Sequence, residues 1–159
     1  MYSQERRDYS VDIGNKTEDL FIIACTKLGY ACTKSDIKTD MYDHIDFFIE
    51  RPSGRTSVDV KGKNTKDCIW VEFKNVRGNH GWLYGKAQYI AFDMPELGGF
   101  VMVGRKELAD RCEQIVEQVF VSKSEALRKF YQRENRMDII AQIVLSDISD
   151  LKSYRVISY

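Results

Sequence analysis

The sequence has no net charge, no closely spaced cysteine pair and no long apolar run, and each absence excludes a class of protein. Its 24 Lys and Arg residues balance 24 Asp and Glu residues, so the total charge indicates no partner. None of the four cysteines forms a C-x-x-C pair, which excludes the tight ligand spacing of a structural zinc site. No segment reads as a membrane span or as a signal peptide. We therefore expect a reduced, cytoplasmic protein that has no membrane partner.

The length of 159 residues indicates one domain, with residues 1–159 sharing one core. We expect that core to lie at about 16–121 and to be followed by a C-terminal extension, 122–159. The sequence contains no internal repeat and no low-complexity segment.

Three segments of alternating apolar and polar residues follow one another between Asp43 and Asn75. Alternation of this kind is typical of strands that bury one face. Two short breaks, Pro52-Ser53-Gly54 and 63–67, predict turns between the three strands. The apolar faces that we expect are Ile45, Phe47 and Ile49 in the first strand, Thr56, Val58 and Val60 in the second, and Ile69, Val71 and Phe73 in the third.

The opposite faces of the first two strands carry charge. Asp59 and Lys61 are two positions apart, so they project side by side, roughly 7 Å apart along the strand. Asp46 comes near them if the first two strands pair. Two carboxylates and an ammonium on one face are costly unless a cation or an anionic ligand joins them. The alternative is a surface ion pair between Asp59 and Lys61, worth only about 0–1 kcal/mol.

Charge is unevenly distributed along the chain. Residues 1–50 carry 6 basic and 10 acidic side chains, whereas residues 51–90 carry 8 basic and 3 acidic ones. A basic patch beside an acidic pocket suits a polyanion held next to a divalent metal, although a solvated lysine-rich loop would give the same count. His80 and Trp82 lie on a glycine-rich segment and could stack on a sugar-phosphate backbone, or simply pack.

The remaining segments predict an α/β fold in which a mixed central sheet is flanked by helices. The first helix should begin at a cap formed by Asn15 or Thr17. The other expected elements are a helix at 18–28, a strand at 30–33, a loop at 34–42, a short helix at 86–92, a strand at 100–103, a helix at 105–120, a helix at 122–131 and a strand at 138–145.

The pattern D/E-x-K occurs four times, so it carries little information without its context. The pairs that begin at Asp36 and Asp150 lie in polar segments without alternation. The pair Asp59/Lys61 lies on an alternating strand that follows the strand bearing Asp46. Glu72/Lys74 also lies on an alternating strand and is the serious rival.

This order of elements resembles the PD-(D/E)XK nuclease superfamily, and in particular its Holliday-junction-resolvase and restriction-endonuclease branches. The resemblance covers residues 18–105 and rests on a helix with Glu18, a strand with Asp46 and a strand with Asp59 and Lys61. One position departs from the pattern, because Ile45 and not proline precedes Asp46.

The resemblance implies a restriction-endonuclease-like fold and a metal-dependent endonuclease that hydrolyses DNA phosphodiester bonds. Asp46, Asp59 and the Val60 carbonyl would bind Mg²⁺, for which Mn²⁺ could substitute, and Glu18 would be a further ligand unless it serves only the helix terminus. Lys61 would assist the attacking water. Gln88 would sit on a helix that supports the site. The residues expected to contact duplex or branched DNA are Lys63, Lys74, Arg77, His80, Trp82, Lys86 and Gln88.

Cutting a duplex or a junction usually needs two sites, so we expect a homodimer. Two other functions stay open at the level of sequence. The first is a catalytically inactive protein that keeps the nuclease-like scaffold and serves as a nucleic-acid-binding or inhibitory protein. The second is a protein whose charged strands form only a protein interface.

Overall fold

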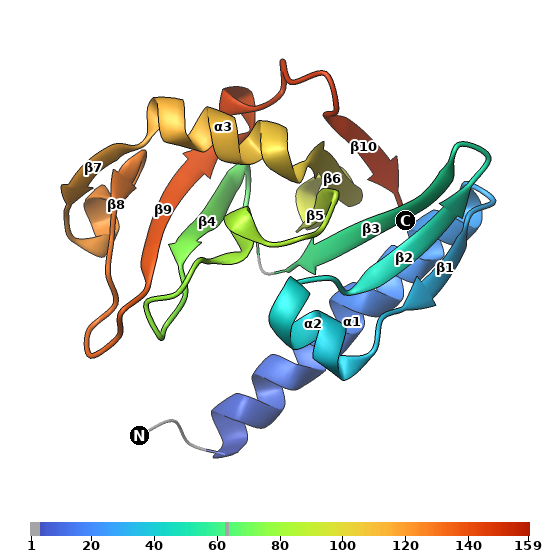
Figure 1. The fold of residues 1–159 in the computed structure, drawn as a ribbon, viewed down its shortest axis with the longest axis horizontal. Coiled ribbons are helices and arrows are strands. Elements are labelled where there is room, and N and C mark those ends of the chain that lie inside the picture. The colour runs from blue at the N-terminus through green and yellow to red at the C-terminus, as the bar shows by residue number, and fades with distance from the viewer. Residues whose placement is uncertain (1–3, 63) are drawn as a thin grey trace.

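The computed structural model describes the backbone of residues 4–62 and 64–159, and the side chains of 16–62 and 64–159. Figure 1 shows the arrangement of the elements. The helices are α1 (Gln4–Lys27), α2 (Ile37–Asp43) and α3 (Arg105–Ile115), with 3₁₀ turns at Trp82–Tyr84, Pro95–Leu97, Lys123–Glu125 and Leu145–Asp147. The strands are β1 (Ala31–Lys34), β2 (Phe47–Arg51), β3 (Gly54–Lys61), β4 (Cys68–Lys74), β5 (Tyr89–Met94), β6 (Gly99–Gly104), β7 (Glu117–Phe120), β8 (Lys129–Phe130), β9 (Ile139–Val144) and β10 (Arg155–Ser158).

A mixed sheet of six strands forms the centre of the molecule, in the order β1-β2-β3-β5-β6-β10. The pair β3–β5 is parallel, and the other pairs in this sheet are antiparallel. A parallel pair needs a long crossover, and here the crossover carries β4. That strand pairs with β9 in a second, two-stranded sheet, and β7 pairs with β8 in a third. The α/β class and the flanked mixed sheet are therefore as the sequence predicts.

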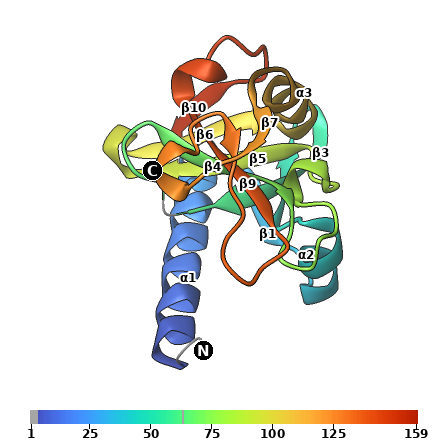
Figure 2. The same cartoon turned by 90° about the vertical axis from the view of Figure 1, so that its left-hand side faces the viewer.

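The two faces of the central sheet are covered by different elements. Alternation sends Ala91 to one face and Ile90 and Phe92 to the other. On the first face, Phe21 and Ala24 of α1 pack against the sheet. On the second face, buried side chains of α3, β4 and β9 complete a larger core. Figures 1 and 2 show α1 and α3 on opposite sides of the sheet.

Two expectations near the N-terminus are wrong. The first helix begins at Gln4, so Thr17 lies inside α1 and does not cap it. Residues 34–42, expected as a loop, contain α2, whose N-terminus is capped by Asp36 Oδ1 accepting from the Thr39 N–H at 2.7 Å. A polar seven-residue helix without a buried residue has no apolar stripe to announce it.

Three later helical expectations are also wrong. The short helix expected at 86–92 is replaced by strand β5, which is buried on both faces and so reads as a continuous apolar run. The helix expected at 105–120 ends at Ile115, because Val116 turns to extended backbone and leads into β7. Residues 122–131 form a 3₁₀ turn and β8 in place of a helix.

The segment 122–159 contributes a strand to each of the three sheets, with β8 in the pair β7–β8. Strand β9 lies along β4, and β10 lies along β6 at the edge of the central sheet. Ile143 and Ile148 are fully buried in the core that also contains α3. No helix in the described part of the chain is long and apolar enough to cross a membrane.

Candidate active site

Strand β3 places Asp59 and Lys61 on the face of the sheet that α1 does not cover. Val58 packs against α1, and alternation turns its neighbour Asp59 to the other side. The Asp59 side chain is 4% exposed, and its Oδ1 lies 3.2 Å from Lys61 Nζ. The two side chains are thus a largely buried ion pair and not a solvated surface pair.

The backbone before β2 brings Asp46 to the same place. The Asp46 N–H donates to the Val58 carbonyl at 2.9 Å, and the Asp46 carbonyl accepts from the Ser35 N–H at 2.8 Å. Its Oδ2 accepts from the Val60 N–H at 2.7 Å. The aspartates of two neighbouring strands therefore lie beside each other, held by backbone on both sides.

Both carboxyl groups are perturbed by this environment. Burial, followed by the negative charge of Asp59, raises the pKa of Asp46 to about 6. Burial also raises the pKa of Asp59, although the Lys61 ammonium offsets part of that effect. Raised carboxyl pKa values show that the negative charges are only partly neutralised by the residues around them.

One oxygen of Asp59 lacks the partner that its burial requires. Asp59 Oδ2 is fully buried and accepts no hydrogen bond from any described residue. A buried ionised oxygen without a hydrogen bond costs free energy unless a proton or a cation meets it. The environment of Asp59 is therefore compatible with a retained proton or with a bound cation.

Helix α2 adds a third carboxyl group, which the sequence analysis did not identify. Asp40 is in hydrogen-bonding contact with Asp46, and burial together with this contact raises the pKa of Asp40 to about 6. Asp43, one turn further, pairs with Lys86 at 3.3 Å. Asp40 is nevertheless an exposed residue, and the only sequence signal for it was the series of aspartates at positions 36, 40 and 43.

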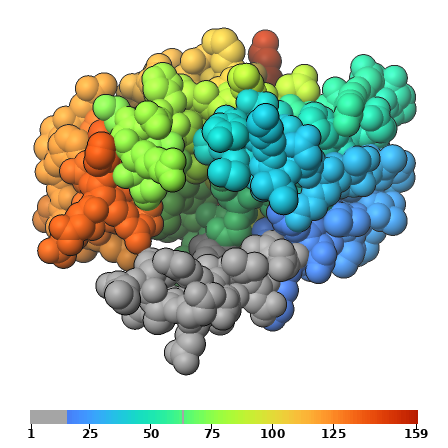
Figure 3. Space-filling model, turned by 60° about the horizontal axis from the view of Figure 1, so that its bottom comes forward, coloured from blue at the N-terminus to red at the C-terminus, as the bar shows by residue number. Residues whose placement is uncertain are grey.

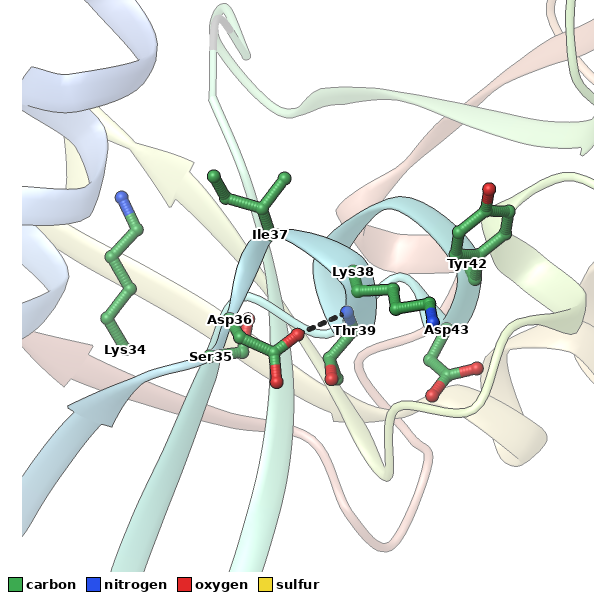
Figure 4. A pocket seen from close by; sticks show the side chains of 8 residues that line it. All are labelled: Lys34, Ser35, Asp36, Ile37, Lys38, Thr39, Tyr42 and Asp43. Atoms are coloured by element: carbon green, nitrogen blue, oxygen red, sulfur yellow. Dashed lines mark hydrogen bonds between the residues drawn. The ribbon is translucent and has the colours of Figure 1, made fainter.

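The apolar side chains of α2 face the solvent. Ile37 is 80% exposed and Tyr42 72% exposed. Together with Lys34 and Lys38 they line an open hollow of about 900 Å³ (Figure 4). Figure 3 shows the face on which α2, in cyan, and the segment that follows β4, in light green, stand above a recess.

Glu18 forms an ion pair elsewhere than expected. Its Oε2 lies 2.7 Å from Lys34 Nζ, and Glu18 sits within α1 rather than at its start. The hydrogen bond that the Lys34 ammonium donates to Glu18 raises the pKa of Lys34, and the negative charges of Asp40 and Asp46 add to this effect. Glu18 therefore reaches the edge of the acidic cluster through Lys34.

Lys61 is fixed by an aromatic ring as well as by Asp59. Its Nζ lies 5.1 Å from the centroid of the Trp82 ring, a distance typical of a cation–π contact. Trp82 is 6% exposed and packs on Phe92, which favours the packing alternative over stacking on nucleic acid. Burial and the Lys61 charge also lower the pKa of nearby His44, a neighbour that no sequence pattern indicated.

The rival pair, Glu72 and Lys74, belongs to a different sheet. Both lie on β4, which pairs with β9. Glu72 Oε1 accepts from the Trp82 N–H at 3.3 Å, and Lys74 is exposed at the end of the strand. This pair supports the turn that carries Trp82.

The residues expected to contact DNA fall into different environments. Lys74, Arg77 and His80 are exposed on β4 and the loop after it. The Lys86 ammonium is paired with Asp43. Lys63 lies outside the described residues.

Gln88 has a structural role and does not lie on a helix, so that expectation is wrong. It precedes β5, and its Oε1 accepts from the buried Ser57 N–H at 2.9 Å, while its own N–H donates to Ser57 Oγ. These bonds join the parallel strands β3 and β5 where they begin to pair.

Replacing Gln88 by Ala should lower the free energy of unfolding by about 1–3 kcal/mol, because the Ser57 N–H loses its acceptor. Urea unfolding measures this loss. Gln88→Glu keeps an acceptor oxygen and is the matched control. Equal stability of the Ala variant and the parent protein would contradict the structural role.

Metal-free protein is expected to lose stability as pH rises from about 4 to about 6. Asp46 and Asp40 have pKa values of about 6, above the ordinary 3.8, so the folded state binds more protons than the unfolded state in this window. Asp46 should contribute on the order of 1–3 kcal/mol, and the more exposed Asp40 less. Thermal unfolding in EDTA at pH 4.5 and pH 7 measures the effect. Asp46→Asn should flatten the profile, and a stability that rises across this window would be inconsistent with the cluster.

The donor set fits a hard divalent cation. In the described residues, no three His, Cys, Asp or Glu side chains are grouped as ligands of one ion. Mg²⁺, however, commonly uses one or two carboxylates and completes its shell with water and substrate phosphate. The orphan Oδ2 of Asp59 and the adjacent Asp46 carboxyl supply two such oxygens.

Comparison with known proteins adds little to this picture. No protein-family model matches the chain, and no curated protein matches it. Among solved structures, a bacterial homing endonuclease, I-Ssp6803I, is similar with a TM-score of 0.45 and 15% sequence identity, over 62% of this chain and 70% of that one. At this TM-score and identity, the match assigns neither a fold family nor an activity to the chain.

Proposed function

We propose that this protein is a Mg²⁺-dependent DNA endonuclease with a restriction-endonuclease-like fold and a site of PD-(D/E)XK type. One observation carries the proposal: the buried Asp59 has an oxygen, Oδ2, without a partner among the described residues, beside the Asp46 carboxyl. Its other oxygen, Oδ1, lies 3.2 Å from Lys61 Nζ. A structural ion pair alone would need only one of the two aspartates.

Asp46 and Asp59 would hold the metal, and the Val60 carbonyl remains a proposed third donor. When bound, Mg²⁺ would neutralise charge on the phosphate and lower the pKa of a bound water. Mn²⁺, which also accepts oxygen ligands, should substitute. Without a cation, the two carboxylates would repel a phosphate, so substrate binding and metal binding should be coupled.

Lys61 would place a fixed positive charge where the phosphate reacts. Asp59 on one side and the Trp82 ring on the other restrict the ammonium to a small volume. A preoriented charge of this kind stabilises negative charge that develops in a transition state without further reorganisation. Lys61 would also orient the attacking water.

Asp40 would be a positioning residue that acts through Asp46. Asp40→Asn should lower the rate of DNA cleavage about tenfold, because Asp46 loses the carboxyl group in contact with it. The dependence of the rate on Mg²⁺ concentration should shift as well, which a purely structural role would not cause. Asp36→Asn is the matched control on the same helix, since asparagine caps a helix as well as aspartate does. Equal Mg²⁺ dependence in Asp40→Asn and Asp36→Asn would contradict the role.

The substrate would be duplex or branched DNA, approached by the exposed Lys74, Arg77 and His80. One chain supplies one such site, so cutting both strands would use a homodimer. Sedimentation that detects only monomer, with and without DNA, would contradict the dimer but not the site.

The direct test is incubation with supercoiled plasmid, a four-way junction and single-stranded DNA in Mg²⁺, in Mn²⁺ or in EDTA. We expect nicking or cutting that EDTA, Asp59→Asn and Lys61→Ala each abolish, while Asp67→Asn, an exposed aspartate outside the site, leaves it intact. A gel shift without cutting under all conditions would contradict the enzyme and favour an inactive DNA-binding protein. If the protein neither binds nor cuts any of these DNAs, a role as a protein interface would be favoured.

A further inference from the structure

A cavity of about 210 Å³ lies between the end of α1 and the central sheet, away from the acidic cluster. Ile49, Met102 and Ile157 form part of its apolar wall, and all three belong to the core beneath α1. Asp59 projects from the opposite face of the same sheet, so the cavity and the candidate active site do not share a surface. What the cavity binds is therefore independent of the proposed function.

Charge in this cavity has one sign. Arg51 and Arg155 both line it, and none of the described residues that line it is acidic. A desolvated cation is costly unless it is paired. This applies to Arg51, which is partly buried, and not to Arg155, which is exposed. An anion in the cavity would supply the partner that Arg51 lacks.

Arg51 is held in place and still has an unused donor. One terminal nitrogen, Nη2, donates to Thr56 Oγ1 at 2.9 Å, and the guanidinium lies over the Tyr89 ring, 5.5 Å from its centroid. The Nε–H is buried and has no acceptor among the described residues. A guanidinium oriented on two sides, with an N–H free at its buried edge, is arranged to receive a carboxylate oxygen.

We infer that this cavity binds a small monocarboxylic acid with an apolar body, its carboxylate on Arg51 and its hydrocarbon part against Ile49, Met102 and Ile157. The volume corresponds to about seven water-sized groups, which suits an acid of the size of hexanoate or phenylacetate. Nucleotides are too large for it, and an inorganic anion would leave the apolar wall without a contact.

The test is an NMR titration of the whole protein with phenylacetate and, separately, with the neutral phenylacetamide. Phenylacetate should shift the backbone amides of Ile49, Met102 and Ile157 and should bind at least about tenfold more tightly than the amide, since a buried charged hydrogen bond distinguishes them. Equal affinity for phenylacetate and phenylacetamide would overturn the inference. So would the absence of a shift at the three backbone amides, and neither result needs a variant.

Two variants on the same hairpin locate the anion. Arg51→Gln should weaken phenylacetate binding about tenfold or more. Arg55→Gln should leave it unchanged, because Arg55 lies outside the cavity, paired with Glu50 and stacked on Phe48. If Arg51→Gln folds, as its amide spectrum would show, and binds phenylacetate as tightly as the parent protein does, the assignment is refuted.

Discussion

Replacing Asp59 by Asn is expected to abolish DNA cleavage and, at the same time, to raise the thermal stability of the metal-free protein at pH 7. The activity should fall by about 10²- to 10³-fold or more, because the buried oxygen that would meet the cation becomes a neutral amide. The stability should rise because burial raises the pKa of Asp59, so keeping this group ionised at pH 7 costs free energy in the folded state. Opposite signs in the two measurements distinguish a functional carboxylate from a structural one.

Two assays on the same samples measure this result: plasmid nicking in Mg²⁺, and thermal unfolding in EDTA. Asp67→Asn, on the exposed turn after β3, is the control for the loss of one carboxylate and should change neither. If Asp59→Asn unfolded at a lower temperature than the parent protein and kept its nicking activity, the Asp59–Lys61 pair would be structural. The stability–activity trade-off is common where an active site holds strained or unpaired groups.

Lys61→Ala is expected to lower cleavage by about 10²-fold and to lower stability as well. The rate falls because the site loses the fixed positive charge beside the reacting phosphate. Stability falls by about 1–3 kcal/mol, because the buried Asp59 is left without its counter-charge, and the partial exposure of Lys61 keeps this below the cost at a fully buried pair. The sign of the stability change is therefore opposite to that of Asp59→Asn.

The double variant Asp59→Asn/Lys61→Ala separates the two effects. Its stability should recover toward that of the parent protein, because position 59 no longer carries a buried charge that needs the Lys61 ammonium. Lys66→Ala, an exposed lysine on the turn after β3, is the control for removing a cation and should retain both properties. A Lys61→Ala variant as stable and as active as Lys66→Ala would exclude a role for Lys61 at the site.

The core of the candidate site could be foreseen because it depends on short-range regularity. Strand alternation fixes that Asp59 and Lys61 share a face. The short turn at Pro52 and Ser53 leaves little choice but for β2 and β3 to pair, which carries Asp46 to Asp59. The strand pairing needs no knowledge of the rest of the chain. The apolar face expected for the first strand holds only for Phe47 and Ile49, since Ile45 precedes β2 and packs in the other core.

The parts that could not be foreseen depend on distant segments. Strand β4 looks like a third neighbour of β2 and β3, yet its partner β9 begins more than sixty residues later, and β3 pairs with β5 instead. That arrangement also buries Trp82 and turns Gln88 into a bridge between strands.

Asp40 was missed for a different reason. Helix α2 has no buried residue and its large apolar side chains face the solvent, so it lacks the apolar stripe by which surface helices are recognised. The contact between Asp40 and Asp46 depends on how this helix packs beside the strand that follows it, which local sequence does not show.

The measurement that tests the central claim most directly is a crystal structure of the protein with Mn²⁺, in which anomalous scattering locates the ion. The account predicts a peak whose nearest carboxylate oxygens are those of Asp46 and Asp59, with Asp59 Oδ2 among them. A peak at Glu72 with none at Asp46 and Asp59, or full occupancy of the Asp59 pocket by a side chain or by water with no ion bound at saturating Mn²⁺, would contradict it.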